Sequence, residues 1–190
     1  MLDAMTTPLI RDSRDTDLTA IQAIYAHHVL NGTGTFEITP PDLAEMTRRR
    51  ADVVKNGFPY LVAHEGDRVL GYAYVNWFRL RPAYRFTVED SIYIDESARG
   101  RGVGRLLLTA LITRCEAAGC RQLLAIIGDS GNTGSIGLHA RCGFRFAGTM
   151  RATGWKFDGW LDTVIMQREL GDADRQAPQL DAPTARGLLP

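Results

Sequence analysis

A glycine-rich segment with three arginines is the part of this sequence best suited to bind an anion. Residues 99–105 read Arg-Gly-Arg-Gly-Val-Gly-Arg and separate a predicted strand from a predicted helix. Glycines let a ligand approach the backbone closely, and the first N–H groups of a helix have no partners within it. Together with the helix dipole, these N–H groups attract negative charge. The alternative is a glycine-rich helix start that binds no ligand. The segment lacks the Gly-Lys-Ser/Thr of a P-loop, and its G-x-G-x-G spacing differs from the dinucleotide-binding fingerprint.

A histidine and a cysteine form a second candidate for chemistry. His139 precedes Cys142 by three residues, so both can share one helix face. A Cys–His pair can support a covalent acyl-enzyme. Here, however, Cys142 directly precedes the helix-stopping Gly143, and the sequence shows no third group that would orient the pair. We therefore reject a covalent acyl-enzyme on Cys142. His139 itself titrates near neutral pH and can serve as acid or base, the alternative being a packing or backbone contact.

The elements that must position these residues follow from hydrophobic periodicity and turn signals. A short apolar start (8–11) precedes two helices, predicted from Asp15 to Gly32 and from Thr39-Pro40 to Gly57. The remaining elements are a hairpin (60–64 and 69–78), a strand (87–94), a helix (103–118), a strand (122–127), a short helix ending at Gly143 and a closing hairpin (144–156 and 161–169). The strand–helix–strand over 87–127 is a parallel crossover, and ligands of open α/β sheets bind at the carboxyl ends of such strands. We expect one domain over residues 1–170 and a mobile tail over 171–190.

Composition excludes several classes of protein. The 190 residues are 45% hydrophobic and 23% charged, which excludes a disordered or coiled-coil chain. Basic and acidic residues number 22 each, so the basic excess typical of nucleic-acid binding is absent. The sequence has no stretch long enough for a membrane span and no signal-peptide layout at residues 1–8, which predicts a cytoplasmic protein without a membrane partner. The three cysteines fit neither a disulfide framework nor a zinc pattern, so we expect free thiols and no metal.

Two motifs in order resemble those of the GCN5-related N-acetyltransferase (GNAT) family. The first is Arg99-x-x-Gly102-x-Gly104, and the second is Asn132-x-x-Ser135-x-x-Leu138-His139-x-x-x-Gly143-Phe144. A third segment, Arg81-x-x-Tyr84-x-x-Thr87-x-Glu89-x-Ser91-x-Tyr93, narrows the resemblance to the phosphinothricin acetyltransferase-like branch. The resemblance covers about residues 9–170. It implies a GNAT-type α/β fold: a mixed, mostly antiparallel twisted sheet, flanked by helices, with a central strand–helix–strand crossover.

The resemblance implies acetyl-CoA as co-substrate. Backbone amides of residues 101–105 would hold its pyrophosphate, and the strand ending at Tyr93 and Ile94 would separate from its neighbour, freeing a backbone N–H to polarise the thioester carbonyl. Asn132 and Ser135 would contact the pantetheine arm and the adenosine end, a role compatible with capping a helix. The implied cofactor-binding residues are Tyr93, Ile94, Arg99, Arg101, Gly102, Val103, Gly104, Arg105, Asn132 and Ser135.

The resemblance also implies two catalytic residues. Glu89 would take the proton of the acceptor amine, directly or through a water, unless it forms a salt bridge with a nearby arginine. His139 stands where many relatives place a tyrosine that protonates the departing thiolate.

The implied acceptor is the α-amine of a small amino acid such as phosphinothricin, methionine sulfoximine or methionine sulfone. Arg81 and Tyr84 would hold its acidic or oxygen-rich groups, with Phe36 and Glu37 near the amine. The branch also implies a homodimer, for which Trp155 and Trp160 are available. Two alternatives stay open: a GNAT enzyme acting on a protein N-terminus, polyamine or aminoglycoside, and a CoA-binding module without turnover.

Overall fold

A seven-stranded, mostly antiparallel sheet forms the centre of the protein. The computed structural model describes residues 7–182. The strands are β1 (Leu9–Asp12), β2 (Tyr60–Glu65), β3 (Arg68–Trp77), β4 (Thr87–Ile94), β5 (Gln122–Gly128), β6 (Arg145–Lys156) and β7 (Gly159–Glu169), in the spatial order β1-β2-β3-β4-β5-β7-β6. The pair β4–β5 is parallel and the other pairs are antiparallel. This arrangement confirms the predicted fold.

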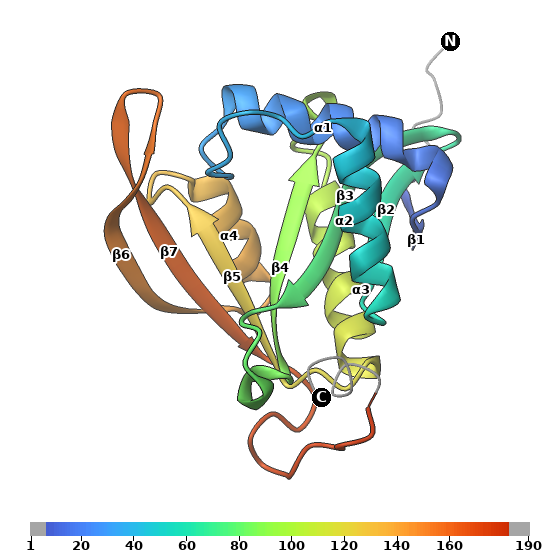
Figure 1. Ribbon diagram of the computed structural model, residues 1–190, viewed down its shortest axis with the longest axis vertical. Coiled ribbons are helices and arrows are strands. Elements are labelled where there is room, and N and C mark those ends of the chain that lie inside the picture. Colours follow the sequence, from blue (N-terminus) through green and yellow to red (C-terminus); the bar gives the residue numbers. More distant parts are fainter. Residues whose placement is uncertain (1–6, 183–190) are drawn as a thin grey trace.

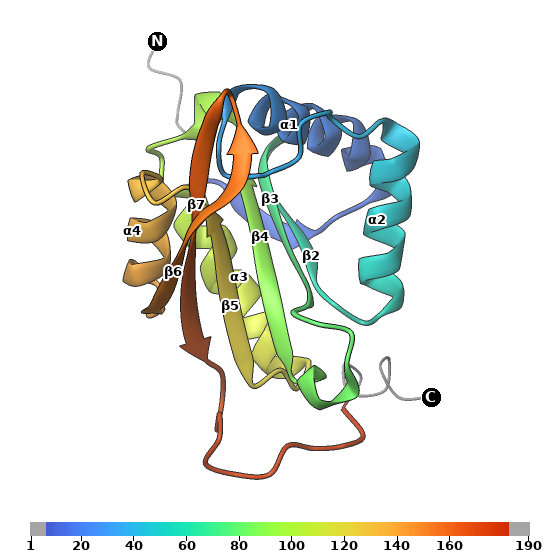
Figure 2. The same cartoon turned by 60° about the vertical axis from the view of Figure 1, so that its left-hand side comes forward.

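Four helices cover the sheet, two on each face (Figures 1 and 2). On one face lie α1 (Leu18–Asn31) and α2 (Leu43–Lys55), and on the other α3 (Val103–Ala117) and α4 (Thr133–Arg141). The alternation of side chains along β3 and β4 decides which residues meet which pair of helices. Among residues 7–182, no helix combines the length and apolarity needed to cross a bilayer.

Helix α2 begins later than predicted. The sequence suggested a start at Thr39-Pro40, but the first helical residue is Leu43 and Asp42 is its N-cap, accepting a hydrogen bond from the Glu45 N–H at 2.8 Å. Two consecutive prolines explain the difference, because each proline disfavours a helical conformation in the residue before it. Asp42 is the first residue after them that can cap the helix.

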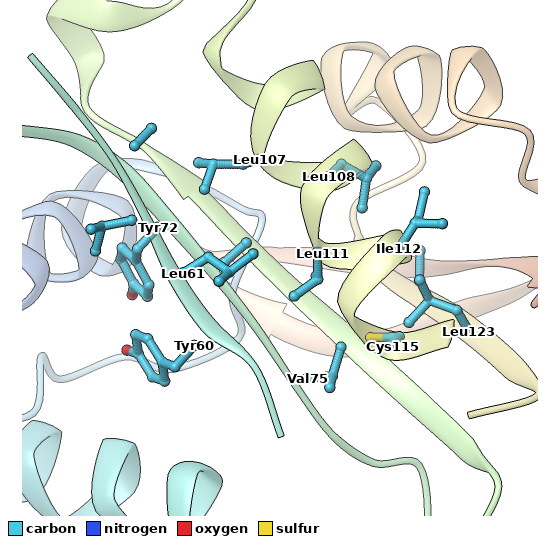
Figure 3. Packing of buried hydrophobic residues seen from close by; sticks show 14 of the residues in the cluster. Tyr60, Leu61, Tyr72, Val75, Leu107, Leu108, Leu111, Ile112, Cys115 and Leu123 are labelled. Carbon is cyan, nitrogen blue, oxygen red and sulfur yellow. The ribbon is translucent and has the colours of Figure 1, made fainter. Parts of the chain in front are cut away.

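One layer of the core lies between α3 and the sheet, and another lies between the sheet and helices α1 and α2. Leu107, Leu108 and Leu111 are fully buried against side chains of β2 and β3 such as Leu61 and Val75 (Figure 3). Burying each such side chain contributes about 1.5–3 kcal/mol, so this layer holds β4 firmly against α3.

The described part of the predicted tail, residues 171–182, contacts the domain. Ala173 and Ala182 are buried, and Arg121 lies 3.8 Å from the Asp172 carboxylate and 3.4 Å from the Ala177 carbonyl. Mobility of 171–190 stays a prediction, and its last eight residues lie outside the described part.

Candidate active site

Strands β4 and β5 separate at their carboxyl ends and open a cleft. Their pairing runs from Thr87–Gln122 to Asp90–Ala125, although β4 continues to Ile94 and β5 to Gly128. Figure 1 shows the two strands as a V, with α4 beside its opening. A cavity of about 960 Å³ occupies this opening, lined by the ends of both strands, the glycine-rich segment, α4 and residues 31–36.

The ladder between β3 and β4 determines which peptide groups of β4 face the cleft. Phe78 N–H donates to the Thr87 carbonyl at 3.1 Å, and Asp95 N–H donates to the Leu70 carbonyl at 2.9 Å. Because hydrogen-bonded positions alternate along an antiparallel pair, the odd-numbered residues of β4 bond to β3. The N–H groups of Ile92 and Ile94 therefore point away from β3, toward the cleft.

Backbone conformation accounts for the glycines that precede α3. Gly100 and Gly102 have φ of 75° and 79°, and a Cβ on either would meet no atom within 4 Å. Glycine is favoured here because L side chains rarely adopt this conformation, and not because space is short. Gly104 differs, since a Cβ there would lie 3.2 Å from Leu138 of α4. The small residue lets α3 and α4 approach at the mouth of the cleft.

The predicted pyrophosphate residues divide into two groups. Arg99 and Arg105 line the cavity together with Gly102, Val103 and Gly104. The Arg101 guanidinium instead bonds the Glu65 carboxylate at the end of β2, and its side chain is not part of the lining. The Arg105 N–H already donates to the Gly102 carbonyl at 3.1 Å, so its side chain is the part available to a ligand.

Glu89 lies half-buried in the lining, on the face of β4 toward α1 and α2. Burial, and secondarily the negative charge of Asp90, raises the pKa of Glu89 from 4.5 to about 7. No salt bridge to Glu89 occurs within residues 7–182, which argues against the salt-bridge alternative. A carboxyl group with this pKa can accept a proton at neutral pH.

His139 is buried with both ring nitrogens bonded. Nε2 lies 3.0 Å from Asp90 Oδ2, Nδ1 lies 2.8 Å from the Ser135 carbonyl, and the ring packs edge-on against Phe144. Burial lowers the pKa of His139, but the hydrogen bond and charge of Asp90 outweigh it, so the pKa is raised. Asp90 is itself buried, and its Oδ1 has no hydrogen-bond partner among the described residues. Sequence analysis missed Asp90, although it directly follows Glu89.

Asn132 and Ser135 lie where the cleft meets α4. Asn132 Oδ1 accepts the Ser135 N–H at 3.2 Å, so Asn132 caps α4, and both residues also line the cavity. Capping of α4 by Asn132 is therefore compatible with ligand contact, because both residues remain at the surface of the cleft.

A lysine that sequence analysis missed fixes the loop between α1 and α2 over the cleft. Lys156 Nζ donates to the Gly32 carbonyl at 2.7 Å and to the Thr35 carbonyl at 2.9 Å, which joins β6 to this loop. Phe36 then packs flat on Gly154, where a Cβ would lie 2.5 Å from the ring. Phe36 is thereby held as a wall of the cavity, and its predicted place near the acceptor amine stays a prediction.

The other predicted acceptor residues lie outside the cavity lining. Glu37 bonds Arg49 at 2.6 Å. Arg81 and exposed Tyr84 belong to the turn before β4, at the amino end of that strand, whereas the cleft opens at the carboxyl end (Figure 1). Within residues 7–182, no three His, Cys, Asp or Glu side chains gather closely enough to hold a metal ion.

Comparison with known proteins gives consistent matches across most of the chain. A family model described as "Acetyltransferase (GNAT) family" matches residues 21–144. A phosphinothricin N-acetyltransferase of Alcaligenes faecalis is 56% identical over 170 residues, covering 90% of this chain and 86% of the relative. An L-methionine sulfoximine/L-methionine sulfone acetyltransferase of Pseudomonas aeruginosa is 44% identical, with 89% and 98% covered. The crystal structure of a GNAT superfamily phosphinothricin acetyltransferase from Sinorhizobium meliloti in complex with acetyl-CoA has a TM-score of 0.90 and 47% identity, with 93% and 96% covered.

Proposed function

This chain belongs to the GNAT family of acetyltransferases, and we propose that it transfers the acetyl group of acetyl-CoA to the α-amine of a small amino acid. Phosphinothricin, methionine sulfoximine and methionine sulfone are the proposed acceptors, on the strength of the relatives that share 44–56% of its residues. The observation that carries the proposal is Glu89, a carboxyl group with a pKa of about 7 in the wall of the β4–β5 cleft.

The cleft has the features that acetyl-CoA requires. The start of α3 presents backbone N–H groups and two arginines, Arg99 and Arg105, to a diphosphate. Further along the cleft, the N–H groups of Ile92 and Ile94 point away from β3, and they would stabilise the negative charge that develops on the carbonyl oxygen of a bound thioester. When bound, acetyl-CoA supplies the activated acetyl group.

Glu89 acts as the base in this proposal. An acceptor amine is protonated at neutral pH and cannot attack until it loses a proton. Glu89 accepts that proton, directly or through a water, and the freed amine attacks the acetyl carbon in a ternary complex. Direct transfer is supported by the lining of the cleft, which contains no cysteine among the described residues.

His139 is the second proposed catalytic residue. In its imidazolium form, Nε2–H donates to Asp90 Oδ2 at 3.0 Å, and both residues line the cleft. When Nε2 gives this proton to the thiolate, a neutral imidazole remains, whose Nδ1–H donates to the Ser135 carbonyl. The pair is thus a suitable proton source for the departing thiolate.

Acetyl-CoA-dependent thiol release with a panel of amines tests the proposal. The panel contains phosphinothricin, methionine sulfoximine, methionine sulfone, methionine, spermidine and a short peptide. We expect the highest kcat/KM with the first three and a lower kcat/KM with methionine, which lacks the oxygens. Turnover confined to spermidine or the peptide would refute the acceptor class, and tight coenzyme A binding without any turnover would favour the binding-module alternative.

A cytoplasmic homodimer without nucleic-acid or membrane partners completes the proposal. Trp155 and Trp160 at the β6–β7 turn are 52% and 66% exposed and contact each other at 5.2 Å between ring centroids, which makes them candidates for a subunit contact. Light scattering of the purified protein tests this state, and a monomer at micromolar concentration would refute it.

A further inference from the structure

A second cavity lies beside the cleft, between α2 and the sheet. It measures about 300 Å³ and is lined by four tyrosines together with Arg49 and Asn76. The tyrosines are Tyr25, Tyr60, Tyr72 and Tyr74. We call this space the tyrosine chamber. None of its lining residues has a role in the sequence motifs.

The tyrosine chamber adjoins the proposed base. Asn76 of β3 lies directly opposite Glu89 of β4, and Tyr74 lies opposite Ser91. Residues opposite each other in an antiparallel pair have Cβ atoms about 4.5–5.5 Å apart and share one face of the sheet. Asn76 lines the chamber and Glu89 lines the cleft, so one cross-strand pair separates the two spaces. The chamber therefore lies within the length of an amino-acid side chain from an amine that meets Glu89.

Three of the tyrosines form a rigid floor. The rings of Tyr60, Tyr72 and Tyr74 lie within 8° of parallel, with centroids 4.8–6.3 Å apart. Figure 3 shows Tyr60 and Tyr72 on the side of the sheet away from α3. Such a stack has little freedom to turn its hydroxyls elsewhere.

The hydroxyl of Tyr72 lacks a hydrogen-bond partner in the described part of the chain. Tyr72 is fully buried, and its hydroxyl makes no hydrogen bond within residues 7–182. Buried polar groups in folded proteins are nearly always bonded, so an exception needs an explanation. Because burial raises the pKa of Tyr72 well above 10, the group stays protonated and can donate to a ligand.

Charge in the chamber is already balanced. Arg49 bonds the carboxylates of Glu37 and Glu45 at 2.6 and 2.7 Å, and Arg48 bonds Glu45 and Asp52. The donors left for a ligand are thus neutral hydroxyls. They suit oxygens of low charge better than a dianion, which would require an unpaired cation.

We propose that the tyrosine chamber binds the side-chain head group of the acceptor, a tetrahedral sulfur or phosphorus group bearing oxygens and at most one negative charge, with the Tyr72 hydroxyl donating to one oxygen. This inference rests on the proposed function and assigns a place to the part of the substrate remote from the amine. It also explains the unpaired hydroxyl as a group that is satisfied when substrate is bound.

Tyr72→Phe tests the assignment, because it removes one oxygen atom and keeps the ring stack. The steady-state KM is measured for methionine sulfone and for methionine, which lacks the oxygens, with acetyl-CoA saturating. We expect KM for methionine sulfone to rise about tenfold, the effect of one hydrogen bond, and KM for methionine to change less than twofold. The melting temperature should be unchanged or higher, since no protein hydrogen bond is lost.

Tyr25→Phe is the matched control. It removes a hydroxyl from the wall of the same chamber, but this hydroxyl is already bonded to Thr35 Oγ1 at 3.0 Å. We expect a lower melting temperature and the same ratio of the two KM values as in the wild type.

The results that would overturn this inference can be distinguished from those that would overturn the proposed function on which it rests. Equal effects of Tyr72→Phe on both substrates, or no effect on either, would refute the chamber assignment while wild-type turnover upholds the function. Absence of wild-type turnover with both substrates would refute the function. In that case, calorimetric titration of methionine sulfone into the coenzyme A-bound proteins tests the chamber assignment independently of turnover. Equal affinity of wild type and Tyr72→Phe, or no binding to either, would count against the assignment.

Discussion

Replacing Glu89 by glutamine should slow catalysis strongly and at the same time stabilise the fold. Keeping this carboxylate charged is unfavourable, because its pKa is raised from 4.5 to about 7 by burial and by Asp90. A shift of this size corresponds to about 3 kcal/mol. The folded state binds the extra proton between pH 4.5 and 7, so wild-type stability falls as the pH rises through this window and the full loss is present above pH 7.

Glutamine is neutral at every pH, so Glu89→Gln avoids this loss. The gain in unfolding free energy should be about 3 kcal/mol at pH 8 and below about 1 kcal/mol at pH 5. For a domain of this size that is roughly 6–12 °C in melting temperature at pH 8. In the same variant kcat/KM at pH 8 should fall about 10²- to 10⁴-fold, and the acidic limb near pH 7 of the wild-type profile should disappear.

Thermal melts at pH 5 and pH 8 and kcat/KM between pH 5.5 and 9 measure both effects. Glu116→Gln, a change at an exposed carboxylate on α3, is the control and should leave the profile and the melting temperatures as in the wild type. An equal gain in melting temperature at both pH values would refute the raised pKa. Persistence of the acidic limb in Glu89→Gln would remove Glu89 from the role of base.

Three further substitutions examine the groups around the base. Asp90→Asn should lower the pKa of His139, visible by NMR as an imidazole titration at lower pH than in the wild type. It should also cost about 3 kcal/mol of stability at pH values well below 6.5, and an unmoved titration would contradict the pairing. Lys156→Met should raise the KM for the acceptor several-fold with little change in the KM for acetyl-CoA, because loop 32–36 loses two hydrogen bonds. Equal changes in the two KM values would argue against a role of Lys156 confined to the acceptor. Gly128→Ala should reduce activity at least tenfold, since a Cβ there would lie 2.3 Å from a backbone carbonyl of loop 32–36. Its circular dichroism spectrum should stay that of the wild type, and full activity would show that the loop can move aside.

Local patterns were sufficient for the order of the elements and for part of the cleft. The glycine-rich segment and Asn132 lie beside strand or helix ends, and short-range rules of turns and caps determine their conformation. Glu89 and Phe36 also line the cleft, while their predicted roles toward the acceptor amine stay predictions.

Residues brought together over long sequence separations could not be predicted in this way. Asp90 meets His139 across 49 positions, and Lys156 meets Thr35 across 121, without any local spacing that marks either pair. Arg81 and Tyr84 show the opposite difficulty. They are close to Glu89 in sequence, but they precede β4, and the direction of the strand places them away from its carboxyl end.

The strict alternation along β4 gives the enzyme two independently adjustable sides. Glu89 and Ser91 face the acceptor side with α1 and α2, whereas Asp90 faces α4. Under the proposed assignment, substitutions at Tyr72 and Tyr74 of β3 would change the acceptor side without touching the cleft, because both residues line the tyrosine chamber and neither lines the cleft. A directed-evolution library confined to Tyr72 and Tyr74 would explore new acceptors while the lining of the cleft stays constant. Deleting a single residue within β4 would instead exchange the two sides and disable both at once.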